Sequence, residues 1–306
     1  MRIKRSIQNL WRYRTLTLMC LPAIAFFFLF SYMPMPGAYV AFTKFNYADG
    51  IFRSKYVGLT NFKFMFTSGQ MWLLLRNTVL YNVAFILLGN VLQMAVAILL
   101  NEIGSRKFRK ITQTLMFLPY FISTVLVSLI VYNLINYDYG YISNLVRRLG
   151  GQMPKIYSLP AAWPFLIVLV NLWQSTGYGS VVYFAAIMGI DASMMEAAVV
   201  DGATGIQRIR YITLPCLKPT FVILLLFAMG GIICGNFGLF YNLVGANSLL
   251  YKTTDIIETY VYRAMMNNFN FSQSSAVGLF QSVVGFFVVI VFNTIVRRVE
   301  PDNALF

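Results

Sequence analysis

Apolar residues gather in six long stretches along the chain, and polar connections separate them. The stretches cover residues 16–33, 77–100, 113–135, 163–188, 219–237 and 275–296, and none contains a Lys, Arg, Asp or Glu. A helix needs about 17–25 mainly apolar residues to cross the hydrocarbon core of a bilayer. The pattern therefore predicts an all-α membrane protein with six transmembrane helices, in a single transmembrane domain over residues 1–306.

Composition supports the membrane assignment. Hydrophobic residues make up 58% of the chain and charged residues 11%, against about 25% charged in ordinary soluble domains. The chain has no His, which excludes catalytic triads with a histidine base and histidine metal ligands. Its three cysteines, Cys20, Cys216 and Cys234, are too few and too scattered for a disulfide framework or a zinc site. Together these features exclude a soluble globular enzyme.

Basic residues predict the orientation of the spans, because Lys and Arg are enriched in cytoplasmic loops. With the N-terminus inside, the inner segments carry 14 Lys and Arg over 67 residues, and the outer segments carry 10 over 107. We therefore expect a multi-pass protein of the cell membrane with both termini in the cytoplasm. The inner excess comes mainly from two clusters, which are Arg2, Lys4, Arg5, Arg12 and Arg14, and Arg106, Lys107, Arg109 and Lys110.

The charge and the first apolar stretch each have a second interpretation. In a soluble protein a net charge of +14 would suggest nucleic acid. In a membrane protein it matches an anionic inner leaflet, so we expect contact with lipid and no nucleic-acid partner. The first stretch follows a basic start, as in a signal peptide. It is long, however, and no small-residue cleavage pattern follows Ser31-Tyr32-Met33-Pro34, which favours a span.

The longest inner connection, residues 191–219, contains signals for two short helices. Asp191 is a good N-cap for the first helix, and Gly202 can adopt the left-handed conformation that ends it. Thr204 and Gln207 stand at capping-box spacing and predict the start of a second helix. The expected local structure is a helix, a glycine turn and another helix.

This connection is unusually apolar for a loop that faces water. We expect Pro215 to end the second helix at Leu214, because proline disfavours helical geometry in the residue before it. A helix-in-groove contact with a cytoplasmic partner fits the pattern, with Glu196 as its polar anchor. Packing on the protein's own inner face is the alternative. The apolar residues are Met194, Met195, Ala197, Ala198, Val199, Val200, Ile206, Ile209 and Ile212.

The same connection has a defined spacing, Glu196-Ala197-Ala198-x3-Gly202-x9-Ile212-x-Leu214-Pro215. It resembles the signature loop of permease subunits of binding-protein-dependent ABC importers. Arg76-Asn77-Thr78, "FLPYFIS" at 117–123 and the segment 190–204 are similar to the carbohydrate branch of that family. "DIIETYVYR" at 255–263 and "AVGLFQSVVG" at 276–285 resemble its aldouronate-type subset, which imports oligosaccharides released from polysaccharides.

The resemblance implies a complex of several subunits. Two six-helix permeases form the pore, and in this subset the second permease is commonly a different chain, so a heterodimer is expected. Two ATPase subunits hold ATP and magnesium, and an extracellular binding protein delivers an oligosaccharide. The chain has no Gly-x4-Gly-Lys-Ser/Thr phosphate loop. We therefore expect it to bind no cofactor and to be a pore-forming subunit, with ATP hydrolysis in its partners.

As the resemblance implies, residues 191–215 form a cytoplasmic coupling-helix loop between spans four and five, which enters a groove on the ATPase. Glu196 meets a basic residue there, and Gly202 makes the turn. ATP closes the ATPase dimer, the loop moves with it, and the spans alternate between inward-open and outward-open states. The other coupling positions are Ala197, Ala198, Ile212, Leu214 and Pro215.

Polar and aromatic residues within the spans are the candidates for the transport pathway. Amides in hydrocarbon need partners and so face protein or a wet cavity, and aromatic rings stack on the apolar faces of sugars. Packing or a place at the membrane interface is the more common role of such aromatics. In the family that the sequence resembles, Lys often occupies the position of Gln174. Because Gln carries no charge, a role of that charge does not carry over to this chain. The candidates are Trp173, Gln174, Tyr178, Tyr183, Asn133, Asn236, Phe240 and Tyr241.

The outer segments add a predicted helix and a hint about the substrate. The spacing of Ile256, Ile257, Tyr260 and Val261 predicts an amphipathic helix over 255–266. The outer segments carry 10 basic and 4 acidic residues. This excess would favour an acidic oligosaccharide such as a uronate, but scattered surface charge is largely screened. The sequence therefore leaves the sugar open.

Two other classes of membrane protein remain as alternatives. An ion-coupled secondary transporter of small neutral solutes normally needs an ionisable group within the membrane, and none lies within the predicted spans. Sodium sites can also use backbone carbonyls and hydroxyls, so this test is not absolute. A structural or scaffolding membrane protein would not need the apolar inner loop.

Overall fold

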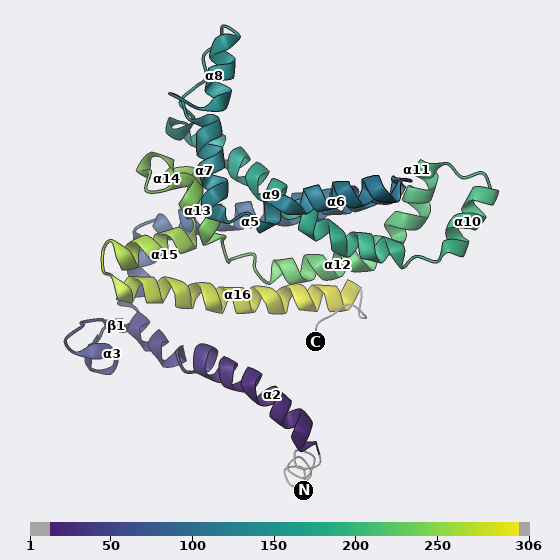
Figure 1. Ribbon diagram of the computed structural model, residues 1–306. Helices are drawn as coiled ribbons and strands as arrows, with labels where there is room; N and C mark the ends of the chain where they lie inside the picture. Colours follow the sequence, from purple (N-terminus) through teal and green to yellow (C-terminus); the bar gives the residue numbers. More distant parts are fainter. Residues whose placement is uncertain (1–12, 300–306) are drawn as a thin grey trace.

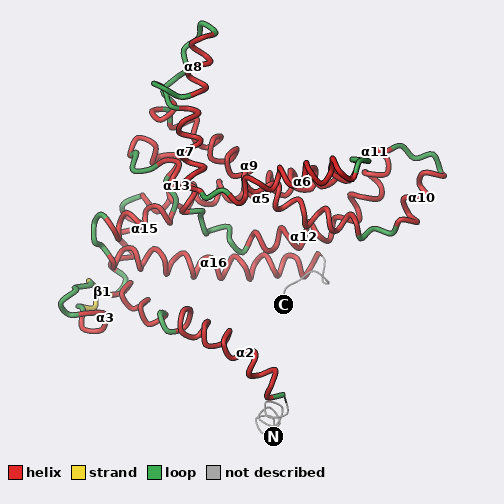
Figure 2. The backbone as a smooth tube through the Cα atoms, viewed as in Figure 1, coloured by secondary structure: helices red, strands yellow, loops and turns green. Residues whose placement is uncertain are grey.

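The computed structural model describes residues 13–299, which are mainly helical (Figures 1 and 2). The long helices are α2 (Arg14–Phe27), α5 (Gln70–Glu102), α6 (Arg106–Phe121), α7 (Thr124–Ile135), α9 (Trp163–Met188), α12 (Leu214–Met229) and α16 (Phe271–Val299). The basic residues Arg2, Lys4, Arg5 and Arg12, on which the predicted orientation partly depends, lie outside the described residues.

Shorter elements connect the long helices. The short α-helices are α3 (Gly50–Arg53), α4 (Thr60–Thr67), α8 (Tyr141–Arg148), α10 (Ala192–Val200), α11 (Gly205–Arg208), α13 (Phe237–Val244), α14 (Tyr251–Thr254) and α15 (Ile257–Met266). Two π-helical turns cover Phe28–Tyr32 and Ile209–Thr213, and 3₁₀ segments cover Met35–Phe42, Ile156–Ser158, Pro160–Ala162 and Ser248–Leu250. Strands β1 (Thr43–Lys44) and β2 (Lys55–Tyr56) form one antiparallel pair, with Thr43 opposite Tyr56.

Within the described residues, five helices are long and apolar enough to cross a membrane. They are Arg14–Phe42, Gln70–Glu102, Pro160–Met188, Gly205–Met229 and Phe271–Arg298. Helices α6 and α7 add a sixth if this bent pair is one span. The predicted fold class, an all-α membrane protein, is confirmed, and the count of six spans holds with α6 and α7 taken together.

The third span is not the continuous helix that the apolar stretch 113–135 predicts. Helices α6 and α7 meet at an angle of 98° at a break after Phe121. Pro119 in the last turn of α6 lacks the N–H that would continue the helical hydrogen bonds. The Ser123 side chain then accepts a hydrogen bond from the backbone N–H of Leu126 and caps α7. Local chemistry thus ends one helix and starts the next.

The fifth span also differs from its predicted bounds of 219–237. One continuous helix runs from Gly205 to Met229, followed by a non-helical segment and the separate helix α13. The expectation that Pro215 ends a helix is wrong. Pro215 lies in the first turn of α12, directly after the π-helical turn, where the hydrogen-bond register changes and a missing N–H is tolerated.

Three buried clusters hold the bundle together, and α5 and α9 lie at its centre. One cluster surrounds Trp163, a second surrounds Met71, and a third surrounds Leu217. Glycines bring the helices close, because a Cβ at Gly177 would overlap the backbone of Met116 in α6. The long helices therefore pack at a distance that larger residues would not allow.

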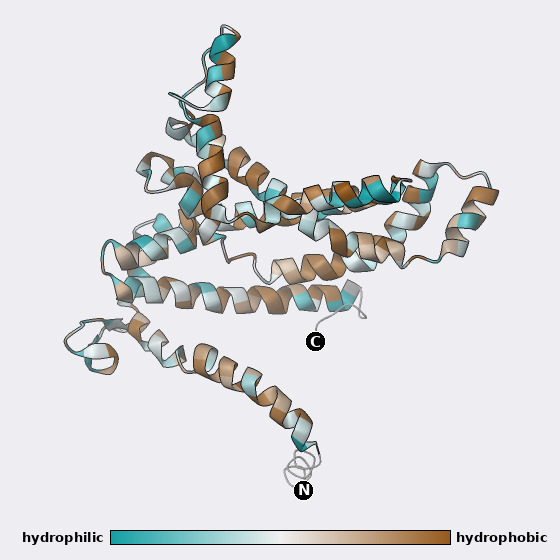
Figure 3. Ribbon diagram, in the orientation of Figure 1, coloured by the Kyte–Doolittle hydropathy of each residue, from teal (hydrophilic) through white to brown (hydrophobic). Residues whose placement is uncertain are grey.

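Helix α2 stands apart from this bundle (Figure 1). Among the described residues, none in α2 is buried, and Figure 3 shows hydrophobic positions along most of its length. Water does not solvate such a surface favourably. The helix therefore requires lipid or another protein chain around it.

The remaining elements lie at the two ends of the bundle (Figure 1). Helices α10 and α11 form a hairpin beyond one end, and α13, α14 and α15 lie at the other. Helix α8 projects beyond the bundle on the side of α7. The helix predicted over 255–266 is found as α15, Ile257–Met266.

Candidate functional site

The hairpin starts with α10, whose ends follow the local signals in the sequence. The Asp191 side chain accepts a hydrogen bond of 2.9 Å from the backbone N–H of Ser193 and caps the helix. This bond lowers the pKa of the Asp191 carboxyl. After α10 the chain turns at Gly202, whose φ of +78° is a geometry that favours glycine. Both predictions, the N-cap and the glycine turn, are confirmed.

The second half of the hairpin begins with the predicted capping box. The backbone N–H of Thr204 donates to the Gln207 side chain over 2.7 Å, and the Thr204 hydroxyl accepts from the backbone N–H of Gln207. From there the helix continues without interruption to Met229. We call this helix, Gly205–Met229, the rod. The hairpin is therefore fixed directly to a membrane span.

The apolar side chains of the hairpin are exposed or half-buried. Val200 is 86% exposed and Ile206 is 78% exposed, and no residue of α10 is buried in the described structure. The alternative that the loop packs on the protein's own inner face therefore finds no support among the described residues. The coupling positions Glu196, Ala197, Gly202, Leu214 and Pro215 are exposed, and Ala198 and Ile212 are half-buried.

At the break of the third span, the structure brings Gln174 and Tyr178 together with residues of α6. The Gln174 side chain donates a hydrogen bond of 2.9 Å to the carbonyl of Ile122, in the break itself. The ring of Tyr178 stacks on Tyr120, with centroids 4.2 Å apart and planes 8° apart. Both rings remain about half exposed. Tyr120 was not among the predicted residues, although it lies within the quoted "FLPYFIS" segment.

The other predicted pathway residues divide into accessible and buried groups. Trp173 is 46% exposed and Asn133 is exposed. Tyr183, by contrast, is fully buried and donates a hydrogen bond of 2.8 Å to the Asn90 side chain. Phe240 is buried with its ring edge-on to Tyr81. In this structure Tyr183 and Phe240 are buried in the core of the bundle.

Asn236 and Tyr241 belong to the second break, after the rod. The Asn236 side chain caps α13 by accepting from the backbone N–H of Leu239. Tyr241 is partly exposed, stacks on Phe237 and meets the edge of Tyr262. The two breaks are neighbours, since the Asn242 side chain on α13 donates to the Thr124 hydroxyl at the start of α7.

Three further side chains bind the backbone of the second break, and sequence reasoning missed all of them. Asn82 donates to the carbonyls of Ile232 and Cys234, and Gln281 donates to that of Ile233. Glu258 accepts from the backbone N–H of Gly235. Glu258 lies outside the predicted spans, yet its carboxylate reaches backbone predicted as membrane-spanning. The only signal available was an acid within the predicted amphipathic helix, which also carries Asp255 and Arg263.

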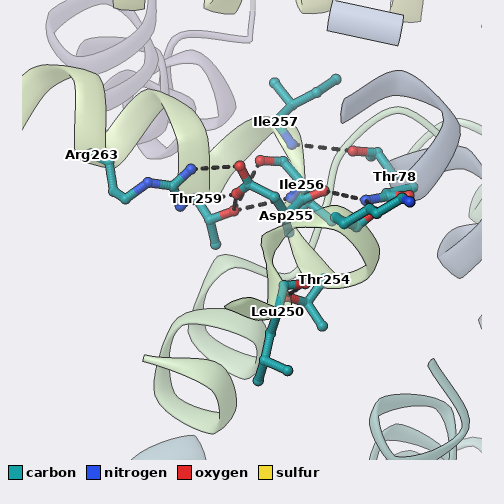
Figure 4. A network of polar contacts seen from close by, with 10 residues as sticks. Thr78, Leu250, Thr254, Asp255, Ile256, Ile257, Thr259 and Arg263 are labelled. Carbon is teal, nitrogen blue, oxygen red and sulfur yellow. Dashed lines mark hydrogen bonds and ion pairs between the residues drawn. The ribbon is translucent and has the colours of Figure 1, made fainter. Parts of the chain in front are cut away.

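A buried polar network holds α15 and the two residues before it in the chain, Asp255-Ile256, against α5 (Figure 4). Asp255 pairs with Arg263 over 2.5 Å and also accepts from the Thr259 hydroxyl. The Asn77 side chain donates to the Asp255 carbonyl, and the backbone N–H of Ile257 donates to the Thr78 hydroxyl. The segments "DIIETYVYR" and Arg76-Asn77-Thr78, far apart in sequence, thus form one contact.

Comparison with known proteins identifies the family. Residues 89–302 match the family described as the binding-protein-dependent transport system inner membrane component. The chain belongs to this family. This permease is therefore a multi-pass membrane component of a binding-protein-dependent transporter, and the resemblance to ABC-importer permeases is confirmed.

Relatives from Bacillus subtilis (strain 168) match nearly the whole permease. Protein LplB is 32% identical over 292 residues, which cover 95% of this chain and 91% of LplB. The polygalacturonan/rhamnogalacturonan transport system permease protein YteP is 33% identical over 300 residues, which cover 98% of this chain and 93% of YteP.

Solved structures show the same fold. A chain in the crystal structure of a bacterial alginate ABC transporter, in complex with an alginate pentasaccharide-bound periplasmic protein, has a TM-score of 0.86 to the permease. It is 32% identical, and the match covers 98% of each chain. A structure of a bacterial ABC transporter involved in the import of the acidic polysaccharide alginate also has a TM-score of 0.86 and 32% identity, over 98% of this chain and 100% of the other.

Proposed function

We propose that the permease is a transmembrane subunit of an ATP-driven importer that moves an oligosaccharide delivered by an extracellular binding protein. The observation that carries this proposal is the exposed apolar hairpin at residues 191–215. Its second half continues as the rod, Gly205–Met229, into a span that breaks after Met229. An exposed apolar hairpin favours a protein partner. A continuous helical connection into the membrane gives that partner a means of moving the spans.

We infer that the partner at the hairpin is an ATPase subunit. Ala197 and Ala198 permit close approach, Gly202 sets the angle between the two helices, and Glu196 provides a charge for a basic residue of the ATPase. Leu214 and Pro215 lie where the hairpin joins α12, and Ile212 packs in the turn before it. ATP and magnesium would be held by two such ATPase subunits, and this chain supplies the moving element.

A second permease subunit would complete the pore. The apolar helix α2 buries none of its residues against the described part of its own chain, and another six-span chain would cover it, with lipid over the rest of the belt. The partner is proposed to be a different permease, as in the subset that the sequence resembles. The excess of Lys and Arg in the inner segments supports a cytoplasmic hairpin and two cytoplasmic termini.

The proposed pathway passes the two broken spans. Unwound backbone in transporters is found where it is buried in protein or lines a cavity. Gln174 and Tyr178 contact the first break and the end of α6 before it, Trp173 is next to Gln174, and Tyr120 adds a second ring beside Tyr178. Asn133 is exposed at the far end of α7. At the second break, Asn236 and Tyr241 have exposed surface. Aromatic faces and amides match the apolar faces and hydroxyls of a sugar. Tyr183 and Phe240 act as packing residues.

The proposed substrate class is an oligosaccharide released from a polysaccharide. The similarity to permeases named for polygalacturonan and rhamnogalacturonan supports this class, as does the similarity to alginate transporters. Those polymers are acidic, and the outer segments of this permease carry more basic than acidic residues. Paired neutral and uronate oligosaccharides of equal length would therefore be compared as substrates.

Uptake by the assembled complex tests the proposal. The permease, its partner permease, the ATPase and the binding protein are reconstituted into vesicles, and entry of a labelled oligosaccharide is followed. The expected uptake requires ATP and the binding protein and is insensitive to ionophores that dissipate proton and sodium gradients. Uptake that follows an ion gradient without ATP would refute the importer and favour a secondary transporter.

A further inference from the structure

Residues 230–236, between α12 and α13, form a non-helical segment in the middle of an apolar region. Every backbone group released from a helix within a membrane needs another hydrogen-bond partner, because hydrocarbon offers none. Gly230 and Gly231 come first and are followed by Ile232 and Ile233, which are buried. The segment thus has a flexible start and an anchored middle.

Three side chains from three different helices bind this anchored part. Asn82 of α5 donates to the carbonyl of Ile232 over 2.8 Å and to that of Cys234 over 3.1 Å. Gln281 of α16 donates to the carbonyl of Ile233 over 2.6 Å. Glu258 of α15 completes the set. We call Asn82, Glu258 and Gln281 the clamp.

Glu258 links the parts of the clamp. Its Oε1 atom accepts from the backbone N–H of Gly235 over 2.5 Å and from the Gln281 side chain over 2.6 Å. Hydrogen bonds to a carboxylate are about twice as strong as neutral ones. The other oxygen, Oε2, is buried without a hydrogen-bond partner and occupies the space that a Cβ on Gly235 would fill. The carboxylate therefore fits against a glycine and against no larger residue.

The rod connects this clamped segment to the hairpin. It is one helix of 25 residues, from Gly205 to Met229, and its length is about 37 Å at 1.5 Å per residue. One end adjoins the glycine turn of the hairpin. The other end meets Gly230 and Gly231, immediately before the clamped residues. A continuous helix thus joins an exposed docking element to a fixed point through two glycines.

We propose that the clamped segment Ile232–Gly235 is the pivot of the rod, and that Asn82, Glu258 and Gln281 are positioning residues that hold it still. The inference rests on the proposed function, in which an ATPase moves the hairpin. The hairpin end of the rod then moves, Gly230 and Gly231 absorb the change of angle, and the clamp keeps α13 in register with α5, α15 and α16. Movement of the rod relative to this fixed point changes the opening between the spans.

Transport coupling tests the role of the clamp in the full reconstituted complex. Glu258→Ala leaves the Gly235 N–H without an acceptor, and sugar transported per ATP hydrolysed is expected to fall about tenfold, with normal assembly. Glu258→Gln retains an acceptor oxygen and is expected to restore most of the coupling. Ser282→Ala, next to Gln281 on α16, removes only a bond to its own helix and serves as the control. Normal coupling in Glu258→Ala would overturn the proposal.

Distances between spin labels test the pivot directly and do not depend on a destabilising variant. The first pair joins Cys234 to Ser282→Cys, and the second joins Cys216, about midway along the rod, to Thr294→Cys on α16. The remaining native cysteines are replaced by Ser in each case. Between nucleotide-free and ATP-bound complexes, the first distance is expected to stay constant and the second to change by several ångströms.

The outcomes separate this inference from the proposed function. If the first distance changes as much as the second, or if the second does not change, the pivot is refuted even when the complex transports sugar. If the unlabelled wild-type complex shows no ATP-driven uptake, the proposed function is refuted and the pivot with it.

Discussion

The side-chain amide of Gln174 donates a hydrogen bond to the backbone carbonyl of Ile122, which lies 52 positions away in the chain. This carbonyl is free because α6 ends at Phe121 and α7 starts at Thr124 with a sharp change of direction. Gln174 thus stabilises the break of a neighbouring span. In the sequence it is only a polar residue among apolar ones. The bond also fixes α9, and with it Tyr178, against α6.

Replacing Gln174 by Leu is expected to weaken this break. The Ile122 carbonyl would lose its donor in an apolar setting, at a cost of about 1–3 kcal/mol, and both thermal stability and uptake should decrease. Gln174→Lys retains a donor of similar reach and is the matched variant. Thermal unfolding in detergent and vesicle uptake measure the two effects. Equal behaviour of the Leu and Lys variants would contradict the role of the hydrogen bond.

The stacked rings of Tyr120 and Tyr178 provide a second test. If they form a platform for a sugar, Tyr120→Ala should raise the sugar concentration needed for half-maximal uptake by a factor of about 3–10, since an aromatic contact contributes about 0.5–1.5 kcal/mol. Tyr120→Phe keeps the ring and should retain most of the affinity. Phe121→Ala, at the exposed neighbouring position, is the control. A loss that is equal for Phe121→Ala and Tyr120→Ala would point to packing alone.

Charge reversal on the hairpin tests ATPase docking. Glu196→Lys is expected to reduce the amount of ATPase that copurifies with the permease and to abolish sugar-stimulated ATP hydrolysis, because like charges would meet in the groove. Asp201→Lys makes the same change of charge at an exposed position of the same hairpin and should have a smaller effect. Normal assembly and coupling with Glu196→Lys would remove this residue from the interface.

Replacing Gly202 by Pro tests the turn itself. Proline fixes φ near −65°, whereas Gly202 has φ +78°, so the two helices of the hairpin could not keep their angle. Loss of ATPase copurification is expected, with the permease still inserted in the membrane. Gly202→Asn, which tolerates the left-handed conformation better than other residues, should retain more binding. Undiminished copurification of the Pro variant would show that the angle of the hairpin is unimportant.

The ion pair between Asp255 and Arg263 should matter for stability, since Asp255 is 8% exposed and Arg263 is 21% exposed. Asp255→Ala leaves the guanidinium without its carboxylate partner and removes one of the two acceptors of the Thr259 hydroxyl, and we expect a loss of about 3 kcal/mol in unfolding free energy. Thermal unfolding measures the effect. Asp49→Ala, at an exposed position, should change little, and a similar midpoint for both variants would be inconsistent with a buried network.

Much of the local structure was predictable because it depends on nearby residues. The Asp191 cap, the Gly202 turn and the Thr204–Gln207 capping box each involve contacts within a few positions, and all three are found. The hairpin's exposed apolar surface was also expected from its composition. The Pro215 prediction was wrong because a π-helical turn, which depends on the helix on both sides, accommodates the proline.

The breaks and the clamp were not predictable from local patterns. An apolar stretch favours a span whether or not the helix within it is continuous. The sequence therefore predicted a single helix for each of the stretches 113–135 and 219–237. Whether a break is tolerated depends on which side chains supply hydrogen bonds, and these come from distant segments such as those of Asn82 and Glu258. The same reason explains the burial of Tyr183 and Phe240. Polarity and aromatic character favoured them as pathway residues, but tertiary packing buries both side chains.

By itself, the amino-acid sequence determined that this protein lies in a membrane as helices and carries an apolar two-helix hairpin between two of them, because hydrophobicity and helix caps act over one or a few turns. The tertiary structure alone decided where two of the spans break, which carboxylate and amides hold the freed backbone, and which aromatic rings remain accessible. Backbone groups released in an apolar interior must find partners wherever folding brings them, and no local pattern records which residues those will be.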